Sequence, residues 1–588
     1  MDRIDTFLSK LNNKKAYALI TGILFPVILA VFSLCKSNLG LDITDSAYNP
    51  YNYKHLGDLD NMWFFSYMFT NFLGAFFTHL PFGSTMLRLN IYTGLVKTAL
   101  VLVSYFFFVK EIKVKREYVF LAVLTATGLC WCPVTVMYNY LTYLFFFLGT
   151  AFIYKGLVRE KNIFLYAAGI FLGINVFVRF PNICEAGLIL AVWYYLAVKK
   201  EKFSLCLKKT GICIGGFVTG LVPGLLAVAL TRGFGAYADG IKSLFAMTEE
   251  ATSYTASGML SNIVRTYISA WPYTELTILL LLLLVLASLI FPHKLEWLRY
   301  ILAAVISVLL LYMLKKKGMF DFNFSAYSSI YYPGILLTEV STIFLVFNLF
   351  RKKNDTGEKL AAVLAILTVI ITPLGTNNGL YANINYMFWV FPVFLYFLFT
   401  AERIDRYFRP LYFGMFILFS ALTFQSFFFG LKFTFRDGSE GRLDSKVTGI
   451  SVVAGMKTTK ENAGDLEELF ARWNERDDKE AGVLLYGNVS GLGFYLDADA
   501  AIGSAWPSLD SYTADTFERE IDRLSSDAGS GHKSPLVIVG NEEWDRIASG
   551  DDLNRKQTIL KEYLGNKGYE TVYYNKRFHV MIAERNGD

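Results

Sequence analysis

Charge is what this sequence has least of. Only 18% of its 588 residues are Asp, Glu, Lys or Arg, while 54% are hydrophobic and 16% aromatic, and the mean hydropathy is +0.39. Soluble domains carry about 25% charged residues. A wholly soluble protein is therefore excluded, and the composition predicts an α-helical polytopic membrane protein with some soluble mass.

Cysteine is also scarce, and its placement excludes one kind of soluble domain. The six cysteines all lie in or beside apolar segments and none follows Cys213, so the C-terminal part has no disulfide framework. That part also lacks a P-loop, a GxGxxG motif after a predicted strand and the His/Cys spacing of a zinc site. We expect no nucleic-acid partner.

Long apolar runs predict about thirteen membrane spans. The first covers residues 16–34 and follows a basic start, which predicts an uncleaved anchor and a cytoplasmic N-terminus. The others are expected near 89–109, 118–138, 140–157, 163–180, 183–198, 211–231, 273–291, 299–314, 332–350, 360–375, 386–400 and 410–430. Most Lys and Arg clusters fall in alternate connections, and this bias places the C-terminus outside the plasma membrane.

Residues 61–80 are apolar enough to cross a membrane, but the charges that follow argue against a span. If the segment crossed, the next span would place the basic cluster of residues 110–116 outside. We therefore interpret it as a helix in the outer interface. Small residues recur along it every four positions, which suits close helix packing, at Ser66, Thr70, Gly74 and Thr78.

The chain changes character near residue 432. We predict a transmembrane domain over 1–431, with a first outer loop at 36–88, and an extracytoplasmic α/β domain over 432–588. Strands and helices alternate in the C-terminal domain, which predicts a mostly parallel sheet. The expected elements are strands at 483–487 and 536–540, helices at 514–524 and 552–564, and a closing hairpin of 570–574 with 578–583.

Two carboxylates, Asp42 and Asp45, directly follow the first predicted span. A carboxylate that is half desolvated at a membrane boundary can be tuned to act as a base. It can also bind a cation or cap a helix, and the local sequence leaves these alternatives open. Together with Asn139, the pair could offer oxygen ligands to Mg²⁺ or Mn²⁺, although nothing in the sequence requires a metal cofactor.

Three short motifs in this layout resemble a known family. Residues 44–48 (TDSAY) are similar to an Asp-Glu-aromatic motif of a first outer loop, with Ser46 in place of the Glu. The pair at 88–89 (RL) opens the second span after a glycine-containing turn, and residues 179–182 (RFPN) end a later span. With these motifs and its predicted topology, the chain resembles the GT-C membrane glycosyltransferases. These include the protein O-mannosyltransferases, the aminoarabinose transferases of lipid A and the oligosaccharyltransferases.

The resemblance implies a reaction. A sugar would pass from a polyprenyl-phosphate donor to a polysaccharide, lipid or protein acceptor of the cell envelope, on the outer face and with inversion. A hydroxyl nucleophile needs a base near neutral pH, a role that we assign to Asp45, with Asp42 as the second candidate. The leaving phosphate needs Arg, Lys or a metal beside it.

The resemblance also implies groups that bind the donor. Cations expected at the outer boundary are candidates for its phosphate: Arg88, Arg179, Arg265, Lys315 and Lys316, with Arg232 and Lys317 as further members. Each of them could instead snorkel or pair with outer carboxylates. Amides and aromatic rings suit sugars, and the candidates are Tyr48, Asn139, Tyr140, Asn377 and Asn378. The turn at 137–143 has no carboxylate where some family members hold a divalent metal, which puts a metal in doubt.

Two other classes of function are compatible with the sequence. A flippase or transporter of lipid-linked sugars would need ionisable residues inside its spans, and Lys97 is the clearest case. A non-catalytic scaffold would use the C-terminal domain to bind envelope partners but would leave the acidic loop without a role.

Overall fold

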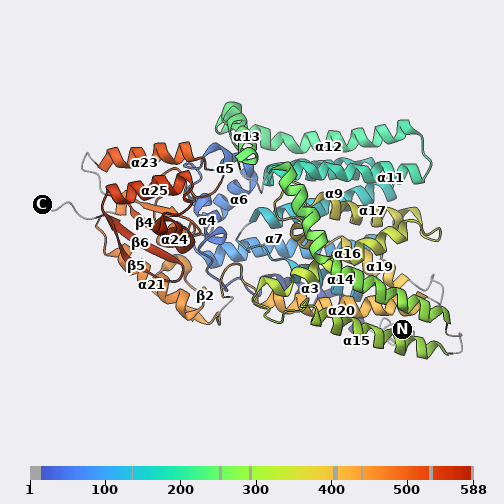
Figure 1. Cartoon of the computed structure of the whole chain (residues 1–588). Coiled ribbons are helices and arrows are strands. Elements are labelled where there is room, and N and C mark those ends of the chain that lie inside the picture. The colour runs from blue at the N-terminus through green and yellow to red at the C-terminus, as the bar shows by residue number, and fades with distance from the viewer. Residues whose placement is uncertain are drawn as a thin grey trace.

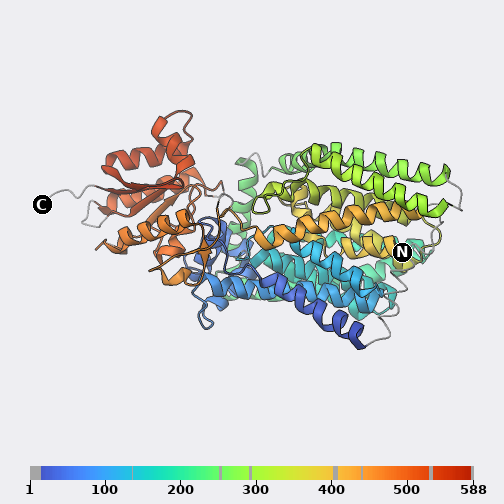
Figure 2. The same cartoon turned by 90° about the horizontal axis from the view of Figure 1, so that it is seen from below.

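The computed structural model describes residues 15–135, 137–250, 255–290, 295–400, 408–438, 441–477, 479–510, 512–528 and 534–583. Most helices form an elongated bundle, and a smaller part made of strands and helices continues from one end of it (Figure 1). The chain enters the bundle at the opposite end, where α2 (Lys15–Leu19) begins (Figure 2). We call the end of the bundle next to the strands the site end.

The bundle consists of apolar helices, whose backbone groups are satisfied within each segment, as a membrane requires. The first, α2, continues through η1 (Ile20–Leu24) into α3 (Phe25–Leu34). The others are α7 (Met86–Phe107) with η2 (Phe108–Ile112), α8 (Arg116–Leu129), α9 (Met137–Val158), α10 (Asn162–Val178), η3 (Phe180–Ile189) with α11 (Leu190–Val198), α12 (Phe203–Leu230), α14 (Ala256–Ile290), α15 (Glu296–Lys316), η5 (Tyr327–Ser329) with α16 (Tyr331–Leu349), α17 (Thr356–Ile371), α18 (Leu380–Asn383) with η6 (Ile384–Tyr386), α19 (Val390–Phe399) and α20 (Arg409–Lys432).

The protein is a polytopic helical membrane protein. Within the described ranges, nine helices are long and apolar enough to cross a membrane, and the pair bent by 68° at α18–α19 would make ten. The other three predicted spans coincide with α8, α10 and α17, which have 14, 17 and 16 residues. Each of the predicted spans thus falls on a helix or on consecutive helices, and the clear departure in length is α8, with 14 residues where the predicted span covers 118–138.

The predicted span at 118–138 shows why one helix is short. Its helix, α8, ends at Leu129, and α9 begins only at Met137. Pro133 lies in the gap, and proline cannot continue a helix because it lacks the N–H donor and its ring clashes with the preceding turn. A backbone group of this gap bonds to another segment of the chain, because the N–H of Trp131 donates to the side chain of Asn385 at 3.1 Å. The residues of this gap are therefore available to line a cavity.

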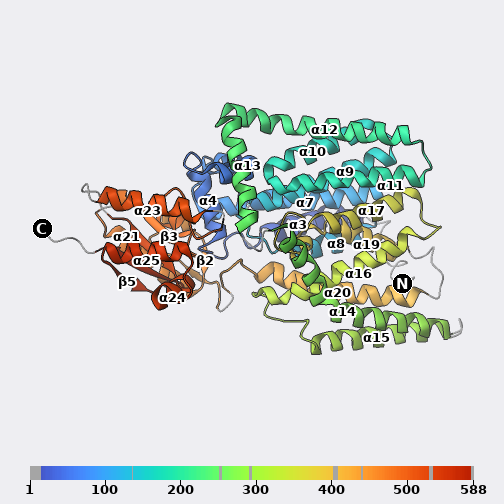
Figure 3. The same cartoon turned by 45° about the horizontal axis from the view of Figure 1, so that its top comes forward.

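The first loop, residues 35–85 between α3 and α7, lies at the site end. It contains α4 (Asp45–Lys54), α5 (Asn61–Ser66) and α6 (Met68–Thr78), so the apolar segment at 61–80 forms two short helices and not a span. Two of its small residues pack closely, as predicted. A side chain at Gly74 would meet the ring of Tyr53, and the Thr70 hydroxyl donates to the Val178 carbonyl at 3.1 Å. Helix α13 (Gly233–Glu250) lies across the same end of the bundle and packs on α5 (Figure 3).

The C-terminal part contains a four-stranded sheet in the order β3-β4-β6-β5. Its strands are β3 (Val483–Tyr486), β4 (Leu536–Gly540), β5 (Tyr569–Tyr574) and β6 (Phe578–Ala583), and a small ladder pairs β1 (Ser445–Lys446) with β2 (Lys457–Thr458). The prediction of a mostly parallel sheet is wrong. Only β3 and β4 are parallel, because the closing hairpin places β6 antiparallel between β4 and β5. The helices are α21 (Lys460–Asn474), α22 (Leu492–Leu496), α23 (Ala514–Ala528), α24 (Asn541–Ser549) and α25 (Arg555–Asn566).

One face of this sheet shares its core with the first loop. Alternate strand residues such as Leu485 and Ile538 pack in one buried cluster with Leu41, Ile43 and Ala47 of the loop. Backbone contacts add to this apolar contact. The N–H of Gly491 donates to the Ile43 carbonyl at 2.8 Å, and residues 39 and 457 form an isolated β-bridge. The first loop is thus held between the bundle and the C-terminal sheet.

Candidate functional site

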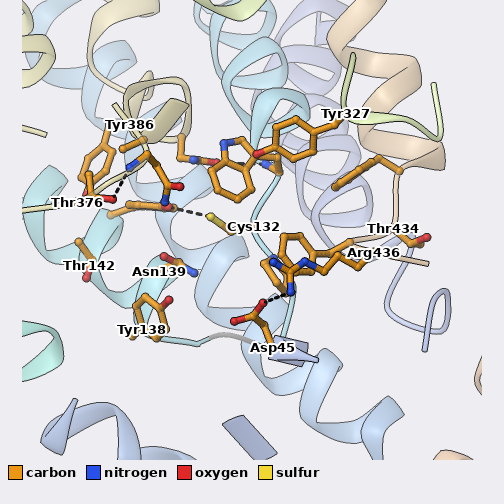
Figure 4. A pocket seen from close by; sticks show the side chains of 18 of the residues that line it. Asp45, Cys132, Tyr138, Asn139, Thr142, Tyr327, Thr376, Tyr386, Thr434 and Arg436 are labelled. Carbon is orange, nitrogen blue, oxygen red and sulfur yellow. Dashed lines mark hydrogen bonds and ion pairs between the residues drawn. The ribbon is translucent and has the colours of Figure 1, made fainter. Parts of the chain in front are cut away.

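A cavity of about 650 Å³ lies at the site end of the bundle. It is bounded by α4 of the first loop, the start of α9, the junction of α10 with η3, the turn at 372–386 and residues 433–437, which we call the exit segment (Figure 4). Its polar and aromatic lining includes Asp45, Cys132, Tyr138, Asn139, Thr142, Tyr143, Arg179, Tyr327, Thr376, Asn377, Asn378, Asn385, Tyr386, Arg436 and Asp437. A mixed lining of this kind suits a ligand with both hydroxyl groups and charge.

Asp45 is the first residue of α4, and its carboxylate points into the cavity (Figure 4). Its Oδ2 atom lies 3.2 Å from Nη1 of Arg436, and its side chain is 35% exposed. Removal from bulk water raises the pKa of Asp45 to about 6, with Asp42 adding to the rise and the Arg436 guanidinium opposing it. A carboxyl group with this pKa changes its charge close to neutral pH, which is what a general base requires.

Asp42 occupies a different position, and the structure does not support its prediction as a second base. Its side chain is 2% exposed, and its oxygens accept hydrogen bonds from the N–H of Thr44 (2.9 Å), the hydroxyl of Thr44 (2.6 Å) and the N–H of Ser46 (2.9 Å). The carboxylate therefore satisfies backbone donors at the start of α4 and does not line the cavity. These contacts match the alternative in which a carboxylate caps the start of a helix.

Arg436 is a site residue that we did not predict from the sequence. It lies in the exit segment with φ at +48°, a conformation that is uncommon for a residue with a side chain. Besides Asp45, its Nη1 atom donates to the hydroxyl of Thr44 at 3.0 Å. By sequence, Arg436 belongs to the predicted C-terminal domain because it follows the last apolar run. Its neighbours Phe435 and Asp437 give no local sign of a site.

Both ends of the exit segment are anchored. At one end the Lys36 ammonium donates to the Phe433 carbonyl at 2.8 Å. At the other, the buried Asp437 carboxylate accepts from the N–H of Leu41 (2.6 Å), the hydroxyl of Thr458 (2.8 Å) and the amide of Asn462 (2.5 Å). These contacts join the first loop, the last helix of the bundle and the C-terminal part, so they fix the backbone of Arg436 beside Asp45.

Arg179 is a second cation of the cavity, and it was predicted. It joins α10 to η3, where the guanidinium Nη2 donates to the Gly375 carbonyl at 3.4 Å and lies over the ring of Tyr138. Its Nε atom is buried and has no hydrogen-bond partner among the described residues, and in that part of the chain it forms no ion pair with a carboxylate. The buried carboxyl of Glu185 interacts with Arg179 electrostatically but forms no ion pair with it. A buried guanidinium N–H without a hydrogen-bond partner is costly, so this side chain marks a place for an anionic ligand.

The predicted sugar contacts divide into two groups. Asn139, Asn377 and Asn378 line the cavity with Asp45 and Arg179. Tyr140 does not, because it lies on another face of α9, where its hydroxyl donates to the Cys132 carbonyl at 3.0 Å; the tyrosine of α9 that lines the cavity near Asn139 is Tyr138. Tyr48 is also absent from the lining, since it is buried edge-on between Trp63 and Trp506.

Most of the predicted cations lie away from the cavity. Arg88 is exposed and covers the ring of Phe82, and Arg265 is exposed on α14. Lys315 and Lys316, at the end of α15, cover their own neighbours Phe322 and Tyr312, and Lys317 is exposed as well. Arg232 donates instead to backbone carbonyls of the first loop. None of these six residues lines the cavity beside Asp45 and Arg179.

The residues predicted to hold a metal do not converge. Asp42 is directed away from Asp45 and is engaged in three hydrogen bonds, and Asp45 is paired with a guanidinium. Within the described ranges, no group of three or more His, Cys, Asp or Glu side chains could hold a metal ion. The predicted oxygen set of Asp42, Asp45 and Asn139 therefore does not fit Mg²⁺ or Mn²⁺.

Comparison with known proteins finds likeness in structure only. No protein-family model matches the sequence, and no curated protein sequence does. ArnT from Cupriavidus metallidurans, bound to undecaprenyl phosphate, aligns over 95% of this chain and 97% of its own, at 11% identity and a TM-score of 0.42. An oligosaccharyltransferase of Archaeoglobus fulgidus, in complex with zinc and sulfate, aligns over 95% of this chain and 73% of its own, at 11% identity and a TM-score of 0.48. Both are enzymes of the kind that the sequence motifs resemble, although likeness at this level is too distant to assign a reaction.

Proposed function

We propose that this protein is a membrane glycosyltransferase that moves a sugar from a polyprenyl-phosphate donor to a hydroxyl group of a cell-envelope acceptor. One observation carries the proposal. The carboxylate of Asp45 lies in the same polar cavity as two guanidinium groups, and one of them, Arg179, is half-buried and forms no ion pair among the described residues, with its Nε atom buried and without a hydrogen-bond partner there. Such a cavity can bind a phosphate and can accept a proton beside it.

The reaction would use these groups as follows. The acceptor hydroxyl attacks the anomeric carbon of the donor, and its proton passes to the Asp45 carboxylate as the new carbon–oxygen bond forms. The bond between the anomeric carbon and the phosphate oxygen breaks, and its electron pair stays on that oxygen. Attack opposite the leaving phosphate inverts the anomeric carbon. The products are the glycosylated acceptor and polyprenyl phosphate.

Arg179 and Arg436 would stabilise the phosphate as its charge grows. Arginine suits this role because the guanidinium can donate two parallel hydrogen bonds to a phosphate and stays charged at every relevant pH. We assign the fixed contact to Arg179, whose Nε atom has no hydrogen-bond partner among the described residues. No metal is needed in this scheme, and the candidate metal ligands Asp42, Asp45 and Asn139 do not converge.

The sugar would lie against the amides and rings of the cavity wall. Asn139, Asn377 and Asn378 offer donors and acceptors, and Tyr138 and Tyr386 offer apolar faces. The charge bias of the connecting segments supports a site end that faces outwards at the plasma membrane. In that orientation the acceptor is an envelope polysaccharide, lipid or protein, and the donor chain reaches the site from the outer leaflet.

A reconstituted assay tests this function. Purified protein in proteoliposomes would receive radiolabelled polyprenyl-phosphate hexoses and pentoses, with an extract of membrane and wall as the acceptor. We expect the label to pass to a polymer or lipid while polyprenyl phosphate is released in equal amount. Movement of intact donor across the bilayer without release would contradict a transferase and would favour the flippase that the sequence left open.

A further inference from the structure

The contact between Asp45 and Arg436 presents a difficulty for the proposed reaction. A carboxylate that is paired with a guanidinium is stabilised in its charged form, which makes it a weaker base. Arg436 is also the only side chain among the described residues that bonds to the Asp45 carboxylate. The hydroxyl of Thr44 is close but donates to Asp42, so its lone pair faces Arg436.

We infer that Arg436 is an exchangeable cation, which pairs with Asp45 in the empty site and moves to the phosphate of the donor when the donor binds. The exchange frees Asp45 to accept a proton only when a donor is present. This inference rests on the proposed function and adds the order of events at its site. It also gives the C-terminal part a role, because Thr458 and Asn462, two of the groups that hold Asp437 beside Arg436, belong to it.

The geometry favours Arg436 and not Arg179 as the group that moves. The Arg436 side chain is 49% exposed. It makes two polar contacts, one to Asp45 and one to Thr44, and its guanidinium lies over the ring of the neighbouring Phe435. Its backbone is fixed by the neighbouring Asp437, whose carboxylate accepts three hydrogen bonds. A fixed backbone with a long, half-exposed side chain allows the guanidinium to swing between two anions without moving the chain. By contrast, the Nε atom of Arg179 is buried, and Arg179 forms no ion pair among the described residues from which it would have to be released.

The surroundings of Asp45 determine what the exchange does to its charge. Asp42 lies close to it on the same loop, and the cavity wall adds Arg179, Asp437, Cys132 and four tyrosines, at 138, 143, 327 and 386. Loss of the Arg436 contact removes the group that holds the Asp45 pKa down, and a bound phosphate adds a negative charge. Both changes favour proton uptake by Asp45 near neutral pH. Donor binding is therefore expected to raise the pKa of Asp45 and to be linked to partial uptake of a proton near pH 6.5, while the Asp45 carboxylates that stay deprotonated are the stronger base.

Methyl farnesyl phosphate is a suitable probe, because this phosphodiester carries the lipid and the phosphate but no sugar and does not titrate near neutral pH. The first measurement is a cryo-electron microscopy structure of the full chain with this probe. We expect its phosphate on Arg179 and Arg436, with Arg436 more than 4 Å from Asp45. A phosphate held by Arg179 while Arg436 stays on Asp45 would overturn the exchange but leave the proposed function standing. Failure of the cavity to bind the probe would contradict both the exchange and the proposed function.

The second measurement is calorimetry in two buffers of different ionisation enthalpy. At pH 6.5, where a group with pKa about 6 is already about one-quarter protonated, we expect the wild-type protein to take up roughly 0.3 to 0.7 proton per bound probe. Asp45→Asn should bind the probe without this uptake, and Asp58→Asn, which removes an exposed acid of the same loop, should behave like the wild type. Equal uptake in Asp45→Asn and wild type would contradict the exchange, since another group would then carry the proton.

Discussion

The carboxylate of Asp437 accepts a hydrogen bond of 2.6 Å from the backbone N–H of Leu41, across 396 residues of sequence. This contact ties the exit of the last bundle helix to the loop that follows the first one. Asp437 also binds Thr458 and Asn462 of the C-terminal part. The three parts that bound the candidate site therefore meet at one buried carboxylate.

Asp437→Asn is expected to lower stability and to weaken donor binding together. The amide keeps the shape of the carboxylate, but one of its two polar atoms is a donor and cannot accept from Leu41, Thr458 or Asn462. A buried donor without a partner costs about 1–3 kcal/mol. Thermal unfolding in detergent would measure the loss of stability. The affinity for methyl farnesyl phosphate would show whether Arg436 still reaches the donor phosphate. A variant with unchanged stability and unchanged binding would show that the exit segment is held by other contacts.

Asp42→Asn is expected to disturb folding of the first loop and not proton transfer itself. An asparagine oxygen can accept from Thr44, but its NH₂ group would then face the N–H of Ser46, donor against donor. We expect a loss of about 1–3 kcal/mol in unfolding free energy. The pH midpoint of any residual activity should move slightly to lower pH, because the Asp42 charge adds to the rise in the Asp45 pKa, whereas loss of a base at this position would abolish transfer.

Arg179→Gln is expected to weaken binding of the phosphodiester probe. A hydrogen bond to a charged group contributes about 1.5–3 kcal/mol, which corresponds to roughly a 10- to 150-fold loss of affinity. The affinity of Arg179→Lys should lie between those of the wild type and Arg179→Gln, since lysine keeps the charge but cannot form the paired hydrogen bonds. Arg88→Gln is the matched control, because Arg88 is exposed on α7 and does not line the cavity. Equal losses at both positions would refute a specific phosphate contact at Arg179.

The interface between the loop and the sheet makes a separate prediction about stability. A methyl group at Gly491 would lie 2.6 Å from the Cβ of Ala47 and 2.9 Å from the Ile43 carbonyl. Gly491→Ala should therefore push α4 away and cost about 1–3 kcal/mol, with lower activity because Asp45 begins that helix. Gly464→Ala is the control. Gly464 is exposed on α21 with no atom near its missing side chain, so alanine there should be neutral or slightly stabilising.

The pH dependence of transfer follows from the pKa of Asp45. Burial raises that pKa to about 6, and the base must be deprotonated to act. The ratio kcat/KM reports the protein without donor, in which Arg436 pairs with Asp45, so it should be flat above about pH 7 and fall about tenfold per pH unit below the midpoint. Arg436→Gln removes the group that lowers this pKa, so its midpoint should move to higher pH. A midpoint that moves to lower pH, or does not move, would show that Asp45 is not the titrating group.

The sequence predicted most of the helices because a membrane makes them long and apolar, and that signal is local. It also predicted that Asp45, Arg179 and the two asparagines at 377–378 lie near one another, because span ends on one side gather there. It could not separate Asp42 from Asp45. The two lie three residues apart, and only the start of α4 at Asp45 decides which carboxylate faces the cavity.

Arg436 could not have been found in the same way. Its position depends on contacts such as Lys36 to Phe433, whose partners lie 397 residues apart. The order of the sheet was missed for a related reason. The buried strands β3 and β4 have the pattern expected of a parallel sheet, but nothing local in the hairpin specifies that β6, and not β5, pairs with β4.

The most direct test of the account measures sugar transfer by Asp45→Asn and Asp58→Asn under identical conditions, with binding of methyl farnesyl phosphate measured on the same preparations. We predict that Asp45→Asn still binds the probe but loses about 10²- to 10⁴-fold in rate, while Asp58→Asn transfers at the wild-type rate. Transfer at the wild-type rate by folded Asp45→Asn would contradict the assignment of Asp45 as the base.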